Sequence, residues 1–279
     1  MGEPDWVPPE VDTRRANPAR VYDYWLGGSH NFLADQDVAR AVTALEPAMP
    51  AIARANRAFL GRAVRLLASA GIDQFLDVGS GIPTEGNVHE IAQRARPGAR
   101  VVYADIDPVA IAHSKAILAG NDDAAVLHAD LRDPGAVLEA AATTKLIDFT
   151  RPIGLILMVV LHFIADTDDP WRIVAALRDA LAPGSYLVLG HATSDGKPAT
   201  AKATEKVYNR SVATRLHLRT RPQIQRFFDG FQLTEPGLVY VPLWRPDSPE
   251  DIPADPGTFG CLVGVASKPK RGQAESPGL

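Results

Sequence analysis

The chain has 279 residues, of which 46% are hydrophobic and 22% are charged, and its formal net charge is -4. This composition is typical of a folded globular protein and excludes a disordered or collagen-like chain. A slightly acidic chain has no global field that attracts phosphates, so we expect no nucleic-acid partner. The single cysteine, Cys261, excludes an intrachain disulfide and a cysteine-rich metal centre, and we expect no metal site.

The first residues, MGEPDWVPPEVD, lack the basic and apolar regions of a signal peptide. No apolar run approaches the ~20 residues of a membrane span. We therefore expect a cytoplasmic protein without a membrane partner. Residues 1–19 are rich in proline and predict an extended arm.

Two helical segments are predicted next. The sequence ARVYDYWLGGSHNF gathers aromatic residues around Gly27 and Gly28 and predicts a helix broken by that pair. Apolar residues recur at helical spacing over 51–70, and Gly71 follows as a C-cap.

Strands and helices then alternate along the chain. Asp-Pro pairs at 107–108, 133–134 and 169–170 predict helix starts, with Asp as N-cap and Pro in the first turn. Alternation of this kind predicts a mostly parallel sheet covered by helices on both faces. The last two predicted strands have no helix between them and should pair in an antiparallel manner. The first predicted strand ends at 75–78. The other predicted strands cover 100–105, 124–130, 152–160, 185–191, 231–241 and 258–267.

These elements predict four parts of the chain. Residues 1–19 form the arm, 20–71 a helical cap or lid, 72–268 an α/β domain, and 269–279 a disordered tail.

The stretch FLDVGSGIPT, residues 75–84, predicts the ligand site. A buried strand ends there in a glycine turn formed by Gly79 and Gly81, and Asp77 places a carboxylate at the end of the strand. In open α/β sheets this is where ligands bind. Asp105 ends the next strand, 24 residues after Gly81, about the spacing at which a carboxylate accepts ribose hydroxyls.

This spacing suits both NAD and S-adenosylmethionine. A dinucleotide fingerprint needs a third glycine beside the pyrophosphate, but Ile82, Pro83 and Thr84 follow Gly81 here. S-adenosylmethionine carries no phosphate, so the sequence favours it. The predicted cofactor contacts are Asp77, Gly79, Ser80, Gly81, Pro83, Asp105, Ile106 on the adenine face, Asp130 on the adenine amino group, and Leu131.

The motifs ARVYDYWLGGSHNF, QFLDVGSGIPTEGNVHEIAQ, ARVVYADIDPVAIAHS, ADLRDP and LMVVLHFIADTDDPWRIV occur in this order. In order and spacing they resemble a family of actinobacterial S-adenosylmethionine-dependent methyltransferases long catalogued as a domain of unknown function. The resemblance covers about 18–269. It implies a class I Rossmann-like methyltransferase fold, with seven mostly parallel strands and the last one antiparallel, and S-adenosylmethionine as cofactor. It supplies no acceptor.

Methyl transfer needs alignment of nucleophile, methyl and sulfur more than it needs an acid or base. His162 follows the fourth strand and is the first candidate for a general base, and Tyr22 is a second catalytic candidate. Either side chain could instead have only a structural role. Tyr22, Tyr24, Gly28, Asn31 and His191 are predicted to belong to a lid or to contact the substrate.

The predicted function is methyl transfer to an unidentified small-molecule acceptor. A non-catalytic S-adenosylmethionine-binding regulator remains open because no acceptor-side residue is compelling. An NAD(P)-dependent oxidoreductase is the other alternative, weakened by the missing third glycine.

Overall fold

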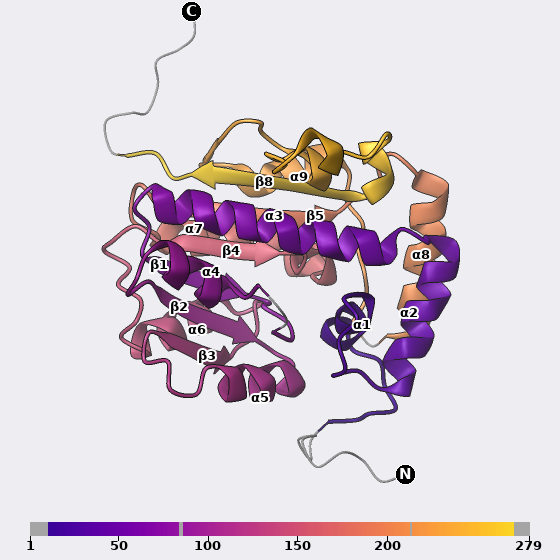
Figure 1. Ribbon diagram of the computed structural model, residues 1–279, viewed down its shortest axis with the longest axis horizontal. Helices are drawn as coiled ribbons and strands as arrows, with labels where there is room; N and C mark the ends of the chain where they lie inside the picture. Colours follow the sequence, from indigo (N-terminus) through magenta and orange to yellow (C-terminus); the bar gives the residue numbers. More distant parts are fainter. Residues whose placement is uncertain (1–10, 84–85, 213, 271–279) are drawn as a thin grey trace, which may run out of the picture.

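The computed structural model describes residues 11–270 apart from residues 84–85 and 213. Much of the predicted arm and nearly all of the predicted tail therefore lie outside the described residues. The centre of the molecule is an eight-stranded sheet with the order β3-β2-β1-β4-β5-β8-β6, and β7 also pairs with β8 (Figure 1). The strands are β1 (Gln74–Val78), β2 (Arg100–Asp105), β3 (Ala124–His128), β4 (Gly154–Met158), β5 (Tyr186–Ala192), β6 (Gln232–Leu233), β7 (Val239–Tyr240) and β8 (Cys261–Ser267).

Nine α-helices in the described residues surround this sheet. They are α1 (Pro18–Trp25), α2 (Leu33–Leu45), α3 (Met49–Ser69), α4 (Val88–Ala95), α5 (Pro108–Ile117), α6 (Pro134–Thr143), α7 (Pro170–Ala180), α8 (Pro198–Ser211) and α9 (Arg221–Gln225). Short 3-10 helices cover η1 (Leu161–Phe163), η2 (Asp166–Asp168), η3 (Arg226–Phe228), η4 (Val241–Leu243), η5 (Pro249–Asp251) and η6 (Pro256–Phe259).

The five strands β1 to β5 are parallel, and β8 runs antiparallel to β5. Side chains alternate between the two faces, because successive residues of a strand point in opposite directions. On one face, strand residues such as Leu76 and Leu155 pack with α6 and α7. On the other face, residues such as Phe75 and Ile156 pack with α3 and α4. The mostly parallel sheet predicted from the sequence is confirmed.

The three Asp-Pro pairs begin helices as predicted. The carboxylate of Asp107 accepts a hydrogen bond from the Val109 N–H at 2.8 Å, and Asp133 accepts one from the Ala136 N–H at 3.0 Å. Asp169 caps α7 in the same way. The cap at Asp107 begins α5 directly after β2, whereas a longer loop with η1 and η2 lies between β4 and the cap at Asp169.

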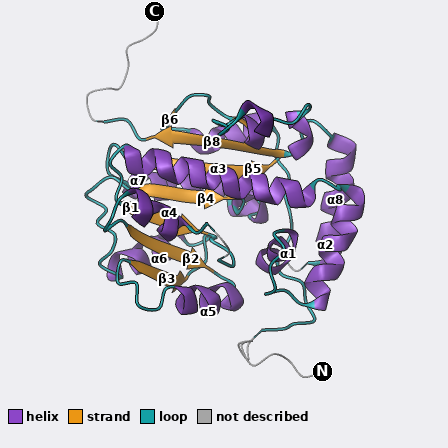
Figure 2. Cartoon of the chain, in the orientation of Figure 1, coloured by secondary structure: helices purple, strands orange, loops and turns teal. Residues whose placement is uncertain are grey.

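The C-terminal strands differ from the prediction in detail. A continuous strand was expected over 231–241, but the structure has two short strands, β6 and β7, separated by a turn that contains Pro236. Proline cannot donate to a strand ladder, so it interrupts pairing here. Both strands pair antiparallel to β8, as predicted. Strand β6 lies at the sheet edge opposite β3 (Figure 2).

Helices α1, α2 and α8 lie together beyond the carboxyl ends of the parallel strands (Figure 1). Their buried residues form a separate apolar cluster that includes Val21, Val42 and Tyr208. A buried ion pair holds α1 to α2: the Arg20 guanidinium lies 3.1 Å from the Asp35 carboxylate. The chain thus closes the ligand side of the sheet with helices from both halves of the sequence.

Candidate functional site

One large cavity, of about 580 Å³, lies between the carboxyl ends of the strands and the three cap helices. Cavities of this size bind small molecules and cofactors. Of the predicted cofactor residues, eight line it: Asp77, Gly79, Ser80, Gly81, Asp105, Ile106, Asp130 and Leu131. Pro83 lines a small adjoining hollow that also reaches Asp77 and Arg57.

The glycine turn after β1 has the geometry that was predicted for it. Gly79 and Gly81 have φ values of +74° and +67°, in the left-handed region that favours glycine. A Cβ on Gly79 would lie 2.2 Å from Val160, so the turn packs tightly against the loop after β4. A Cβ on Gly81 would meet nothing within 4 Å. Open space therefore lies directly against the backbone at Gly81.

Asp105 ends β2 and holds the glycine turn. Its carboxylate accepts hydrogen bonds from the Gly81 N–H at 2.7 Å and from the Asp107 N–H at 2.8 Å. Burial raises the pKa of Asp105, and these backbone donors oppose the rise. Each carboxylate oxygen has a further lone pair, so Asp105 can hold the turn and still accept hydrogen bonds from a ligand.

Asp77 lies in β1, and only 4% of its surface is exposed. Burial raises the pKa of its carboxyl to about 7, although the nearby Arg57 guanidinium lowers it. Below about pH 7 the Asp77 carboxyl is therefore mostly protonated. A cation beside it would favour the charged carboxylate. Arg57, on α3, also donates to the carbonyl of Gly86 at 2.9 Å.

The third strand end carries Asp130 and Leu131. The Arg132 guanidinium pairs with Asp130, with Nε 2.9 Å from Oδ2, and this hydrogen bond lowers the pKa of Asp130. Ile106 lines the cavity and is 51% exposed, an unusual exposure for a large apolar side chain. An apolar ring could cover Ile106, and Asp130 could share its carboxylate between Arg132 and a ligand.

The predicted lid residues separate into two groups. Tyr22 lines the cavity, and its hydroxyl donates to the carbonyl of Ala53 at 3.1 Å. Tyr24, Gly28 and Asn31 are not among the residues that line it.

Gly28 and Asn31 instead stabilise the turn between α1 and α2. The Asn31 amide donates to Asp23 at 2.8 Å and to the Gly28 carbonyl at 2.9 Å. A Cβ on Gly28 would lie 2.0 Å from the Asp23 carboxylate, so a larger residue would displace the side chain that holds this turn.

His191 is fully buried, and the structure places it behind the cavity wall. Its Nδ1 lies 2.6 Å from the Ala192 carbonyl, and its Nε2 lies 2.9 Å from Nη1 of Arg219. Because Arg219 always donates, Nε2 must accept and Nδ1 must carry the proton. Burial keeps the pKa of His191 well below its usual range. Both ring nitrogens are thus engaged within the protein.

Arg219 is a structural residue that the sequence did not reveal. It is 1% exposed, and it donates to the carbonyls of Leu161 and Ile164 at 3.0 and 2.8 Å. Its Nη2 also lies 2.6 Å from the Asp166 carboxylate. Arg219 therefore fixes the loop after β4, which carries His162, to the end of β5.

His162 belongs to that loop and lines the cavity. Its Nδ1 faces the Ala192 N–H at 3.4 Å, which leaves Nε2 as the nitrogen that carries the proton. The pKa of His162 is lowered to about 3, mainly by burial and to a smaller extent by the positive charge of Arg219 and by the nearby His217. The imidazole is therefore neutral at physiological pH.

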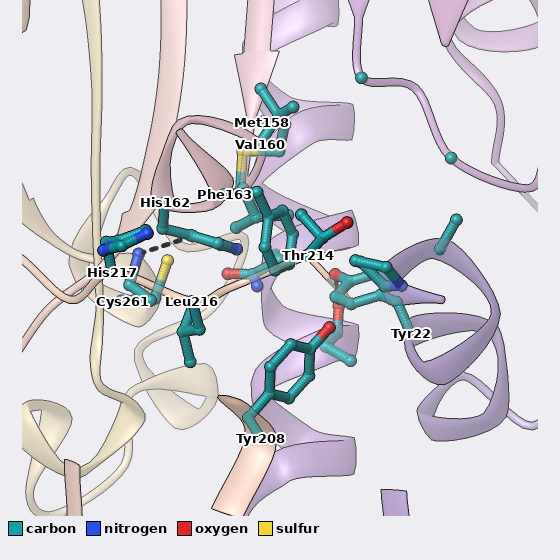
Figure 3. Close-up of a pocket in the computed structure, with 18 of the residues that line it drawn as sticks. Tyr22, Met158, Val160, His162, Phe163, Tyr208, Thr214, Leu216, His217 and Cys261 are labelled. Carbon is teal, nitrogen blue, oxygen red and sulfur yellow. Dashed lines mark hydrogen bonds between the residues drawn. The ribbon is translucent and has the colours of Figure 1, made fainter. Parts of the chain in front are cut away.

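Other cavity residues had no clear signal in the sequence. Figure 3 shows Phe163 and Tyr208 converging on one space with the predicted residues His162 and Tyr22; His162 and Phe163 belong to η1, Tyr22 to α1 and Tyr208 to α8. Tyr208 comes from α8, and Phe163 lies 6.0 Å from it, ring centre to ring centre. Further lining residues are Asn56, Thr204, Thr214, Leu216, Leu218, Phe259 and Cys261. We call the space that these residues and the four in Figure 3 enclose the cap chamber.

The residues at the strand ends fit S-adenosylmethionine. Gly81 offers open backbone, and Asp105 offers carboxylate acceptors. Ser80 Oγ and Asp107 Oδ2 are buried beside the cavity without a hydrogen-bond partner in the described residues, so a bound ligand can satisfy them. In the same residues no group of three His, Cys, Asp or Glu side chains could hold a metal ion.

The strand order, the glycine turn after β1 and the carboxylate at the end of β2 define a class I S-adenosylmethionine-dependent methyltransferase fold. The model of the S-adenosyl methyltransferase family matches residues 4–269. The chain belongs to this family, and its cofactor is S-adenosylmethionine.

Two crystal structures from actinobacteria are similar over almost the whole chain. A proposed methyltransferase from Thermobifida fusca YX shares 41% identity with a TM-score of 0.89, over 96% of this chain and 100% of that one. A DUF574 family protein from Streptomyces avermitilis shares 39% identity with a TM-score of 0.88, over 92% and 99%. No protein of curated function matches this chain. Within the described residues, no helix is both long and apolar enough to cross a membrane.

Proposed function

We propose that this protein transfers a methyl group from S-adenosylmethionine to a small molecule bound in the cap chamber. The observation that supports this best is the continuity of the cavity, which joins the glycine turn at Gly79–Gly81 to the cap chamber. A cofactor held at the strand ends and an acceptor in the cap chamber would then share one space. When bound, S-adenosylmethionine supplies an electrophilic methyl group on a positively charged sulfur.

The strand ends would divide the cofactor among them. Asp105 would accept from the ribose hydroxyls, and Ile106 with Leu131 would contact the adenine ring, whose amino group would reach Asp130. At the other end, Asp77 would face the amino group of the methionine part, and Arg57 its carboxylate. These assignments are proposals that rest on the positions of the side chains around the cavity.

On the acceptor side, the protein would work by alignment. Proximity and orientation alone can lower a barrier by about 7 to 11 kcal/mol. His162 is a weak candidate for a general base, because a base works best when its pKa lies near the operating pH and burial lowers that of His162 to about 3. We propose that its Nε2–H donates to the acceptor and orients it. Tyr22, whose hydroxyl already donates to Ala53, would shape the chamber.

Binding of the cofactor should release a proton from Asp77. In the free protein the pKa of Asp77 is about 7, above the usual 3.8, so folding favours the protonated form and stability falls as pH rises between these values. The ammonium group of the methionine part would favour the carboxylate. At about pH 6, calorimetric titration with S-adenosylhomocysteine in buffers of different ionisation enthalpy should show release of up to one proton per site. Asp77→Asn should abolish it, and heats independent of buffer in the unmodified protein would contradict this assignment.

Two measurements test the function itself. Calorimetry should show binding of S-adenosylhomocysteine and none of NAD, because the turn lacks the third glycine that a pyrophosphate requires. Tritium from methyl-labelled S-adenosylmethionine should then appear in a small molecule of a cell extract. Binding without any transfer of label would show a non-catalytic binder, and binding of NAD alone would show an oxidoreductase.

A further inference from the structure

The cap chamber is enclosed mainly by apolar and aromatic side chains. Phe163 and Tyr208 stack at an interplanar angle of 29°, and Tyr22 approaches them from α1 (Figure 3). Glu46 and Lys197, which also line the cavity, form an ion pair with 3.3 Å between Nζ and Oε2. Walls of this kind accept a molecule of aromatic size and oppose burial of an unpaired charge.

Asn56 places an unused hydrogen-bond acceptor on this wall. It lies on α3, is 4% exposed and lines the cavity, and its Oδ1 has no hydrogen-bond partner in the described residues. The Tyr22 hydroxyl proton is engaged by Ala53, so the Asn56 side chain can hydrogen-bond Tyr22 only as a donor, through its amide nitrogen. In this orientation of the amide, Oδ1 is the atom that has no partner in the described residues. A buried acceptor without a partner is unfavourable, and a ligand N–H or O–H can satisfy it.

None of the residues that define the cap chamber is a strong base, and Glu46, which lines the same cavity, is paired with Lys197. Nδ1 of His162 faces the Ala192 N–H, and the pKa of this histidine is lowered to about 3 by its burial. Burial also raises the pKa of Tyr22 and Tyr208, and that of Cys261 to about 12. A hydroxyl could donate to Asn56, but the amide oxygen cannot take its proton away. An anion would be repelled by the same oxygen.

We infer that the methyl acceptor is an uncharged amine carried on an aromatic or alicyclic ring system, and that Asn56 Oδ1 accepts its N–H. This inference rests on the proposed function. The nitrogen lone pair forms the new N–C bond while the C–S bond breaks and its electron pair stays on sulfur. The amine becomes a methylated ammonium and keeps its proton until it reaches water, so no base is required.

The same residues would stabilise the charge that develops on nitrogen. The hydrogen bond to Asn56 Oδ1 strengthens as the donor becomes cationic, because charge-assisted hydrogen bonds are about twice as strong as neutral ones. The ring of Tyr22, which lines the same cavity, would add a cation–π contact. Asn56 would then act more strongly in the transition state than in the ground state, as a catalytic group should.

The test compares two probes of the same shape. Tetrahydroquinoline is a neutral secondary amine with one N–H, and chroman has an ether oxygen at that position. Calorimetry on the full chain saturated with S-adenosylhomocysteine should show at least tenfold tighter binding of tetrahydroquinoline. Asn56→Leu should abolish this preference while leaving the affinity for S-adenosylhomocysteine unchanged. Asn56→Asp keeps an acceptor oxygen and should retain the preference for tetrahydroquinoline. The control Ser69→Ala, at the far end of α3, should retain this preference as well.

Labelled methyl should reach tetrahydroquinoline and not tetrahydronaphthol, the hydroxyl analogue. Equal binding of the two probes to the unmodified protein would overturn the inference, as would label on the naphthol. If Asn56→Leu lost the binding of S-adenosylhomocysteine as well as that of the amine, Asn56 would lie at the cofactor. This result would also overturn the inference. All of these outcomes overturn only the inference, because the unmodified protein still binds S-adenosylhomocysteine in each of them. If the unmodified protein did not bind S-adenosylhomocysteine, the proposed function itself would be refuted.

Discussion

Asp105→Ala should weaken the binding of S-adenosylhomocysteine by about a hundredfold or more. Hydrogen bonds to a charged group contribute about 1.5–3 kcal/mol each, and the two ribose hydroxyls would donate two of them to this carboxylate. Each 1.4 kcal/mol corresponds to a tenfold change in the dissociation constant. The substitution also removes the acceptors for the Gly81 and Asp107 N–H groups, so the glycine turn loses its support. Isothermal titration calorimetry measures the change directly.

Asp133→Ala is the matched control. Asp133 caps α6 after the next strand by the same device, but it does not line the cavity. Loss of this cap should cost about 1 kcal/mol of stability and leave the affinity for S-adenosylhomocysteine as it was. Equal affinities of the Asp105 variant and the unmodified protein would refute the ribose assignment.

Arg219→Met should lower the free energy of unfolding by about 3 kcal/mol or more. Methionine fills much of the volume but leaves the carbonyls of Leu161 and Ile164 without their buried donor, and His191 Nε2 loses its partner as well. Unfolding by urea, followed by circular dichroism, gives the free energy.

The Asp166→Asn variant separates the two roles of Arg219. The side chain of Asp166 is 59% exposed, so its ion pair with Arg219 should contribute less than about 1 kcal/mol. A small effect of both substitutions would show that the buried hydrogen bonds of Arg219 do not hold the loop after β4.

The parts of the fold that the sequence predicted are those encoded locally. An Asp-Pro pair caps a helix through residues two or three positions away, as Asp107 does with Val109. A glycine turn after an apolar strand is local in the same sense, and Gly79 and Gly81 have the predicted conformation. Such signals were enough to predict the sheet and the position of the cavity.

Residues whose roles depend on distant contacts could not be found in this way. Arg219 binds His191, Ile164 and Leu161, which lie 28, 55 and 58 residues from it in the sequence. Helix α8 has only one buried residue, Tyr208, so its weak apolar pattern did not predict a chamber wall. His191 was predicted at the substrate because β5 ends there, but the buried Arg219 engages its ring.

Asn31 shows why the cavity wall includes only some of the predicted lid residues. Its place beside the aromatic residues suggested a contact with the ligand, but Asp23 requires its amide in the turn between α1 and α2. Tyr22, three residues after Ala19 on the same short helix, has no such local partner and reaches across to α3 instead. Asn31 thus stays in the turn because its amide donates to a nearby carboxylate, whereas Tyr22 has no such carboxylate beside it and reaches the cavity.

A crystal structure with S-adenosylhomocysteine tests the central claim most directly, namely that the ends of β1, β2 and β3 hold this nucleoside with its sulfur turned toward the cap chamber. The account predicts ribose hydroxyls within hydrogen-bond distance of Asp105, adenine against Ile106, and the sulfur facing the space shared by His162 and Tyr22. Density for the nucleoside anywhere else, or none at a saturating concentration, would contradict it.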